Sequence, residues 1–198
     1  MKHPSPQRYN SVAISLHWLI ALLILGLLAS GFIMGELENS AFKYKIFQLH
    51  KSFGITVLGL SLLRLAWRLL TPVPSLPDGK TWEIWLARAV RLGFYVLMIG
   101  MPLVGWLGVS TSPLKIPTVL FGLVPLPNLP FFQDVPEAAK QFFELHETMA
   151  FIMIGLLCLH FGAAVKHHFL FKNDVLLRMA PLWTHGVLRA LRGQSSVS

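Results

Sequence analysis

The sequence predicts an all-α membrane protein, a bundle of four transmembrane helices. The hydrophobic fraction of its 198 residues is 54%, and only 13% of the residues are charged. The mean hydropathy of +0.60 is outside the usual range of a soluble domain of this size. Four apolar stretches are each long enough to cross a bilayer, for which a helix needs about 20 residues.

The four expected spans are residues 12–35, 50–70, 87–110 and 146–166. The helix of the second span is expected to begin before the membrane, because Phe42, Ile46 and Leu49 recur at helical spacing. The helix of the fourth span should likewise begin early, through Phe142 and Leu145.

Prolines mark the two longer connections between these spans. Residues 71–82 and residues 111–136 each contain several prolines, so both are predicted to be loops. Residues 1–181 are therefore predicted to form one bundle domain. Residues 182–198 are predicted to form a basic cytoplasmic C-terminal tail with a disordered, serine-rich end.

The distribution of basic residues predicts the orientation of the bundle. Lysine and arginine outnumber aspartate and glutamate by 17 to 9, which gives a formal net charge of +8. They cluster at the N-terminus, around the second connection and after the last span, as membrane topology requires, so nucleic acid is not the expected partner. Both termini are expected on the cytoplasmic side.

Four histidines lie within the expected spans, and the depth of each can be compared. His17 lies about six residues into the first span from the cytoplasmic side, and His160 lies the same number of residues before the end of the fourth. His50 and His146 each begin a span that runs inward, so both are expected near the outer face. The rise of about 1.5 Å per residue therefore predicts two pairs, His17 with His160 and His50 with His146.

These pairs predict two b-type haems enclosed by the bundle, with the four histidines as iron ligands. An imidazole in lipid is costly unless it is paired or metal-bound. Two imidazoles at each level fit the axial positions of a porphyrin iron, whereas bare zinc or copper would need more protein ligands. Because Cys158 is the only cysteine, a disulfide within the chain and a covalently attached c-type haem are both excluded.

Two alternatives stay open for the histidines. A slip of the fourth helix would make His167 a rival of His160, because it lies seven residues further along. The histidines could instead serve as relays in a haem-free transporter or proton channel. Acidic residues in the membrane would support a relay, but the central parts of the spans contain no aspartate or glutamate.

Two basic residues are candidates for contacts with the cofactors. Arg64 follows His50 by fourteen residues on the same helix face, which places it at the depth of the inner pair, near a haem or a bound quinone. Lys51, beside His50, could neutralise an outer haem propionate or attract an anion such as superoxide, although interfacial snorkelling would also explain it.

The chain resembles the bacterial cytochrome b561 family of dihaem membrane proteins, which includes superoxide oxidases. The resemblance covers nearly the whole chain and depends on five groups of residues. These are Arg8-Tyr9 with His17-Trp18, the stretch 49–54, Arg64-Leu65 with Arg68, His146-Glu147-Thr148, and the stretch 159–181. It implies haem b ligation by the same two histidine pairs, residence in the bacterial inner membrane, and ubiquinone as the electron partner.

Two functions are expected from these observations. The first is an oxidoreductase that passes single electrons across the membrane to or from quinone, with superoxide as a donor outside the cytoplasm. The second is a haem-bearing membrane anchor that relays electrons for a separate dehydrogenase or a periplasmic partner. Members of the cytochrome b561 family differ in their electron donor, so the superoxide reaction does not follow from the resemblance.

Overall fold

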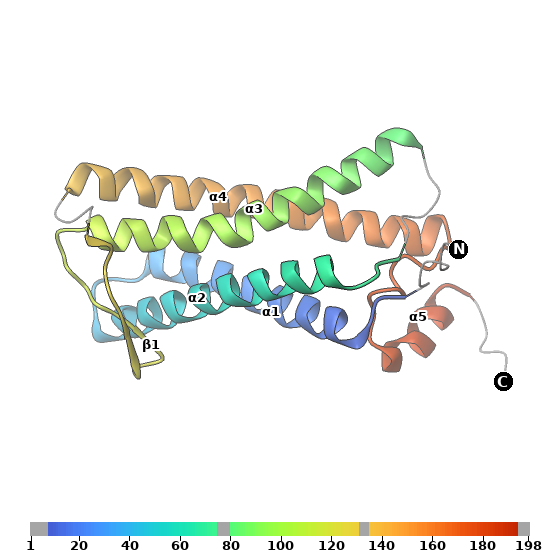
Figure 1. Cartoon of the computed structure of the whole chain (residues 1–198), viewed down its shortest axis with the longest axis horizontal. Helices are drawn as coiled ribbons and strands as arrows, with labels where there is room; N and C mark the ends of the chain where they lie inside the picture. The colour runs from blue at the N-terminus through green and yellow to red at the C-terminus, as the bar shows by residue number, and fades with distance from the viewer. Residues whose placement is uncertain (1–7, 75–79, 131–134, 194–198) are drawn as a thin grey trace.

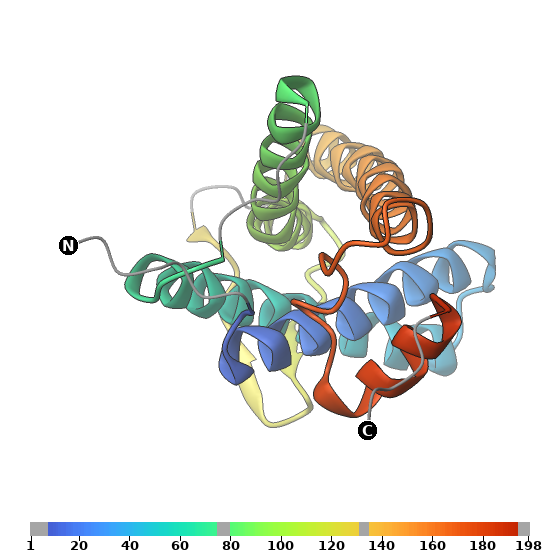
Figure 2. The same ribbon diagram turned by 90° about the vertical axis from the view of Figure 1, so that its right-hand side faces the viewer.

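Four long helices form the bundle that the sequence predicts (Figure 1). The computed structural model describes residues 8–74, 80–130 and 135–193. The helices are α1 (Ser11–Glu36), α2 (Ala41–Leu70), α3 (Thr81–Thr111) and α4 (Pro136–Val165). Each is long and apolar enough to cross a membrane. The view along the bundle shows α1 and α2 on one side and α3 and α4 on the other (Figure 2).

The helices are longer than the predicted spans because they extend beyond the apolar segments. α2 begins nine residues before His50, as the early periodicity predicted, and α4 begins ten residues before His146. α3 starts at Thr81, within a segment predicted to be loop. Side chains define two of the starts: Asn10 Oδ1 accepts from the backbone N–H of Ala13 at 2.9 Å, and Ser40 caps α2 in the same way.

A layer of apolar side chains fills the middle of the bundle. Its buried members come from all four helices: Ile20, Ile24, Val57, Leu97, Met98 and Met153. Many other large apolar side chains face outward, which is the expected arrangement when lipid is the solvent.

The connection between α3 and α4 contains a short hairpin that the sequence did not predict. β1 (Thr118–Leu120) pairs antiparallel with β2 (Val124–Leu126). The hairpin lies against the N-terminal half of α2, where the backbone N–H of Phe121 donates to Ser52 Oγ at 2.9 Å. The ring of Phe121 also contacts the ring of Phe53, with centroids 5.2 Å apart.

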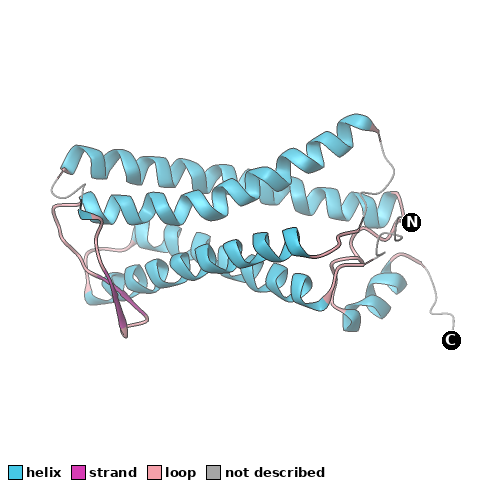
Figure 3. Cartoon of the chain, in the orientation of Figure 1, coloured by secondary structure: helices cyan, strands magenta, loops and turns pink. Residues whose placement is uncertain are grey.

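The chain beyond α4 folds against the other end of the bundle (Figure 3). α4 continues into a π-helical turn, η2 (Lys166–Leu170), and a coil then leads to η3 (Leu182–Thr184) and α5 (His185–Leu191). The first part of the predicted tail is therefore helical. The predicted disordered end, residues 194–198, lies outside the described residues.

Candidate functional site

The four histidines form two facing pairs, one toward each end of the bundle. We call His50 and His146 the outer pair and His17 and His160 the inner pair, after the orientation that the sequence predicts. The rings of His17 and His160 have centroids 6.0 Å apart and planes inclined at 74°. The rings of His50 and His146 are 6.1 Å apart and inclined at 66°. The structure therefore brings together the same residues that the depth argument paired.

The spacing of each pair fits one metal between two imidazoles. A metal bound at about 2 Å to one nitrogen of each ring places the two ring centres about 6 Å apart. Among the described residues, no cluster of three or more His, Cys, Asp or Glu side chains is arranged to hold a metal ion. A bare ion would thus have only two protein ligands, whereas a macrocycle with four nitrogens completes the coordination of iron.

Open space beside the outer pair also suits a flat ring. Gly54 lies one turn after His50 on the same face of α2, and no atom lies within 4 Å of a Cβ built there. On the other side, Gly105 of α3 lies directly under His146, because a Cβ there would be 3.2 Å from its Cε1 and Nδ1 atoms. His146 is thus packed from behind by α3, and its ring faces that of His50.

Both outer histidines are held in the tautomer that can bind a metal through Nε2. Nδ1 of His146 lies 3.0 Å from the carbonyl of Met101, which can only accept, so Nδ1 donates. Nδ1 of His50 lies 2.9 Å from Oγ of Ser30, whose own proton is donated to the carbonyl of Leu27. Nδ1 of His50 therefore donates as well, and Nε2 of both rings keeps its lone pair.

The inner pair has the opposite arrangement at His17. Nη1 of Arg64 lies 3.0 Å from Nδ1 of His17, and a guanidinium can only donate, so Nδ1 accepts and Nε2 carries the proton. No described residue forms a hydrogen bond with the ring of His160. The centroid of this ring lies 6.0 Å from that of His17 and 5.5 Å from that of Phe94. The inner pair can bind a metal through Nε2 of His17 only after Arg64 releases Nδ1.

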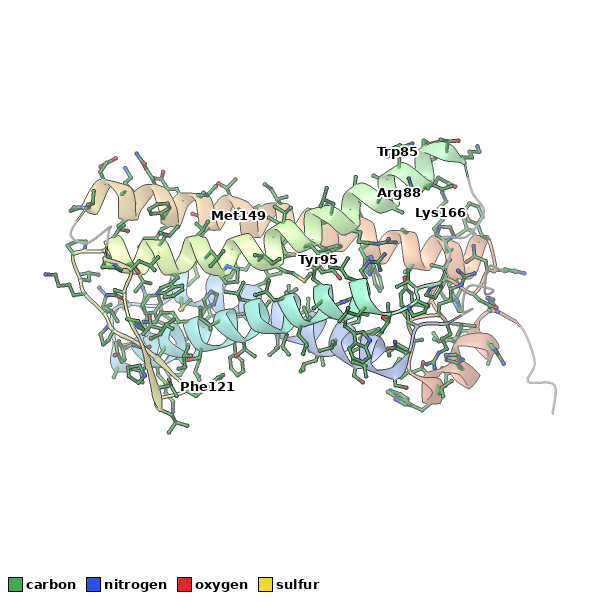
Figure 4. All side chains as sticks on the ribbon, viewed as in Figure 1. Trp85, Arg88, Tyr95, Phe121, Met149 and Lys166 are labelled. Atoms are coloured by element: carbon green, nitrogen blue, oxygen red, sulfur yellow. The ribbon has the colours of Figure 1, made fainter. Side chains whose placement is uncertain are left out.

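Arg64 belongs to a basic pocket at the inner end of the bundle. Its guanidinium also lies near the hydroxyl of Tyr95 and near Arg68. The labelled Tyr95 side chain projects from α3 toward α2 in Figure 4. The lining residues are Tyr9, Asn10, Ala13, Arg64, Trp67, Arg68, Thr71, Pro72, Val73, Tyr95 and Met179. This lining contains no carboxylate, so the pocket suits an anionic or carbonyl-bearing group.

A short segment after η2 fastens the start of the chain beside this pocket. The N–H of Tyr9 donates to the carbonyl of Arg178 at 3.2 Å, and Arg8 donates to that of Ala180 at 2.7 Å. Nε1 of Trp18 donates to the carbonyl of Met179 at 3.0 Å. The indole of Trp18 therefore holds this segment in place.

Lys51 follows His50 in α2, and its side chain contacts the loop before the hairpin. Its Nζ donates to the carbonyl of Pro117 at 2.8 Å and lies 4.7 Å from the centre of the Phe47 ring. The side-chain amide of Gln48 donates to the same carbonyl, also at 2.8 Å. Lys51 therefore ties the loop to the outer end of α2.

The remaining histidines lie away from the two pairs. His167 contacts Asn173 through Nδ1 and packs against Phe171, and the residue that faces His17 is His160. His168 is fully buried. His185 is half-buried, with Nε2 3.3 Å from the carbonyl of Ala180. His3 lies outside the described residues.

Sequence reasoning missed the groups that orient these side chains. Ser30 and Met101 carry no signal of a role, because serine is common in membrane helices and the second contact is made by a backbone carbonyl. Tyr95 could have been noticed as a hydroxyl within an apolar span. Arg91, which lies near Arg68, had been counted only for topology.

Four spanning helices whose interior carries opposed imidazole pairs are the arrangement of a membrane b-type cytochrome. The comparisons agree, because residues 8–181 match the prokaryotic cytochrome b561 family. The chain belongs to this family, whose cofactor is haem b.

Three curated relatives cover almost the same part of the chain. Cytochrome b561 homolog 2 of Escherichia coli (strain K12) is 33% identical over 88% of this chain and 92% of its own length. The probable superoxide oxidase CybB of Yersinia pestis is 29% identical, and cytochrome b561 homolog 1 of Escherichia coli is 27% identical. Both of these matches cover 88% of this chain and 97% of the relative.

Proposed function

We propose that this membrane cytochrome binds two haem b groups and moves single electrons across the inner membrane to or from ubiquinone. The outer haem is assigned to His50 and His146, and the inner haem to His17 and His160. The observation that carries the proposal is the spacing of about 6 Å between facing imidazoles at two levels. When bound, each haem iron supplies one-electron redox chemistry.

The outer histidines are positioned for ligation before any cofactor arrives. Ser30 and the Met101 carbonyl hold Nδ1–H of His50 and His146, so each Nε2 points its lone pair away from these anchors. Groups of this kind fix the orientation of a ligating imidazole and raise its basicity. The outer site thus needs little rearrangement to bind iron.

The inner site requires Arg64 to change partners. Ligation through Nε2 of His17 requires a proton on Nδ1, so the guanidinium must give up this bond. Tyr95 lies within reach of the guanidinium in the pocket. There Arg64 can pair with a propionate of the inner haem, and a tyrosine hydroxyl of the lining can donate to a quinone carbonyl.

On the outer side, we propose that the donor is a small anion, with superoxide as the favoured case. The 29% identical relative from Yersinia pestis carries the name of probable superoxide oxidase. Lys51 lies beside His50, and Lys43 and Lys45 lie in the first turn and a half of the same helix. A cluster of positive charge at the mouth of a site raises the local concentration of an anion.

The proposed orientation places both termini and the basic pocket in the cytoplasm, and the hairpin in the periplasm. The distribution of lysine and arginine along the sequence supports it. Membrane lipid surrounds the four spans in either orientation.

The test is superoxide consumption by purified, haem-replete protein in the presence of ubiquinone. We expect quinone-dependent loss of superoxide and formation of ubiquinol, both reduced strongly by His50→Ala. Absence of activity in protein with a full haem content would refute the superoxide reaction. Haem reduction only in the presence of a copurifying dehydrogenase would instead identify the chain as a relay anchor.

A further inference from the structure

The chain ends in a short helical foot whose outward side is apolar. We define the foot as residues 182–192, which comprise η3, α5 and the residue that follows. Leu182, Trp183, Val187 and Leu191 are 67%, 84%, 64% and 62% exposed. The last three are spaced by four residues, so they follow one another along one side of the segment. Such a row of exposed apolar side chains indicates an interaction surface.

Polar contacts fix the opposite side of the foot to the end of α4. Nε2 of the fully buried His168 lies 3.0 Å from the carbonyl of Leu188. Arg192, only 8% exposed, donates to the two carbonyls of residues 172–173 at 3.2 and 2.8 Å and pairs with Asp174 at 2.9 Å. The foot cannot turn its apolar side toward the bundle without breaking these contacts.

The foot lies where the spans end, beside the bundle. Figure 1 shows α5 at the end of the molecule where α1 begins and α4 ends. The view along the bundle places it outside the ring of four helices, next to α1 (Figure 2). Leu170 and Phe171, at the end of the fourth span, are 70% and 50% exposed and extend the apolar surface toward the foot. This position corresponds to the headgroup layer of the adjoining leaflet.

The charge of the segment favours lipid as the occupant of this surface. Arg189 and Lys172 are exposed, and the sequence from residue 175 to the end contains no aspartate or glutamate. Apolar side chains next to basic ones are the pattern of a helix that lies in the interface of an anionic leaflet. A binding surface for a protein partner would not need to be continuous with the lipid-facing surface of a membrane span.

We propose that the foot inserts Trp183, Val187 and Leu191 into the adjoining lipid leaflet, with Arg189 at the level of the lipid phosphates. Because its rear side is fixed to the turn that ends α4, the inserted foot holds that turn at a constant depth. This proposal does not depend on the electron-transfer reaction.

The test places a fluorescent reporter on the foot of the full-length protein in lipid nanodiscs. Cys158→Ser removes the only native cysteine, and Val187→Cys then carries a bimane label. The matched control is Lys80→Cys in the same background, an exposed polar position just before α3. Each protein is exposed to iodide in the buffer and, separately, to brominated phosphatidylcholine and phosphatidylglycerol in the disc.

We expect the label at residue 187 to be quenched several-fold more by brominated lipid, and several-fold less by iodide, than the label at residue 80. Adding Leu191→Glu should reverse much of this difference while the haem spectrum stays unchanged, because Leu191 faces away from the bundle. Equal iodide quenching at both positions, without quenching by brominated lipid, would overturn the proposal. The surface would then be in water and open to a protein partner.

Discussion

A methyl group at position 105 would press directly on a proposed ligand of the outer haem. A Cβ built at Gly105 lies 3.2 Å from both Cε1 and Nδ1 of His146, whereas carbon contacts are most favourable at about 3.5–4.0 Å. The imidazole must therefore move by a few tenths of an ångström. Nδ1 is the atom that donates to Met101 at 3.0 Å, so the movement strains this hydrogen bond.

The expected effect of Gly105→Ala is local. Alanine is favoured over glycine inside a helix by about 1 kcal/mol, and a strained hydrogen bond costs about the same amount. The free energy of unfolding should therefore change little. Groups that orient a metal ligand typically contribute about 10- to 100-fold to metal affinity, so we expect the outer site to lose haem affinity on that order.

The assay measures haem binding in a His17→Ala background, where only the outer site remains. Haem content and the reduced-minus-oxidised spectrum are compared between Gly105→Ala and a matched control, Gly100→Ala. The control methyl would meet only the terminal Cε of Met149, at 3.0 Å, and this flexible side chain, labelled in Figure 4, can turn aside. If Gly105→Ala binds haem as tightly as Gly100→Ala, then His146, the side chain that packs against Gly105, is not a ligand of the outer haem.

His50→Ala should lose the outer haem and His160→Ala the inner one, so each variant keeps half of the wild-type haem; a full content in either would contradict the ligand assignment. Arg64→Leu should lower the midpoint potential of the inner haem, because a nearby cation favours the reduced iron. Arg64→Lys keeps the positive charge, so its inner haem should have a midpoint potential close to that of the wild type. A redox titration with an unchanged inner potential in Arg64→Leu would exclude this role. Ser30→Ala removes the acceptor for Nδ1–H of His50 and should cost about 1 kcal/mol, or roughly fivefold in outer haem affinity. Haem transfer to an acceptor globin measures this loss, and equal transfer rates from Ser30→Ala and wild type would show that the hydrogen bond contributes nothing.

The pairing of histidines could be predicted because it depends only on helix rise and direction. Once the spans and their order are known, the depth of His17 or His146 follows from counting residues. The structure places both pairs as this count requires. The fold class was predictable for the same reason, since length and hydropathy set the spans.

Contacts that depend on the rotation of a helix about its axis could not be predicted. Whether Ser30 or another residue of α1 faces His50 is decided by side-chain packing, and the carbonyl of Met101 has no signature in sequence. His168 lies next to His167 in the sequence, yet His168 is fully buried and His167 is not, because successive residues of a helix point in different directions and His168 faces the segment around Leu188. The hairpin was missed because its strands are three residues long and lie among prolines.

The apolar layer between the two imidazole levels has a consequence for bioenergetics. None of its six side chains, Ile20, Ile24, Val57, Leu97, Met98 and Met153, can ionise or carry a proton. These six side chains therefore provide no step for a proton between the two levels, whereas an electron can tunnel through such a layer. In the proposed function, electron transfer between the levels is electrogenic. Its driving force varies with membrane voltage, by about 2.3 kcal/mol per 100 mV for a charge that crosses completely.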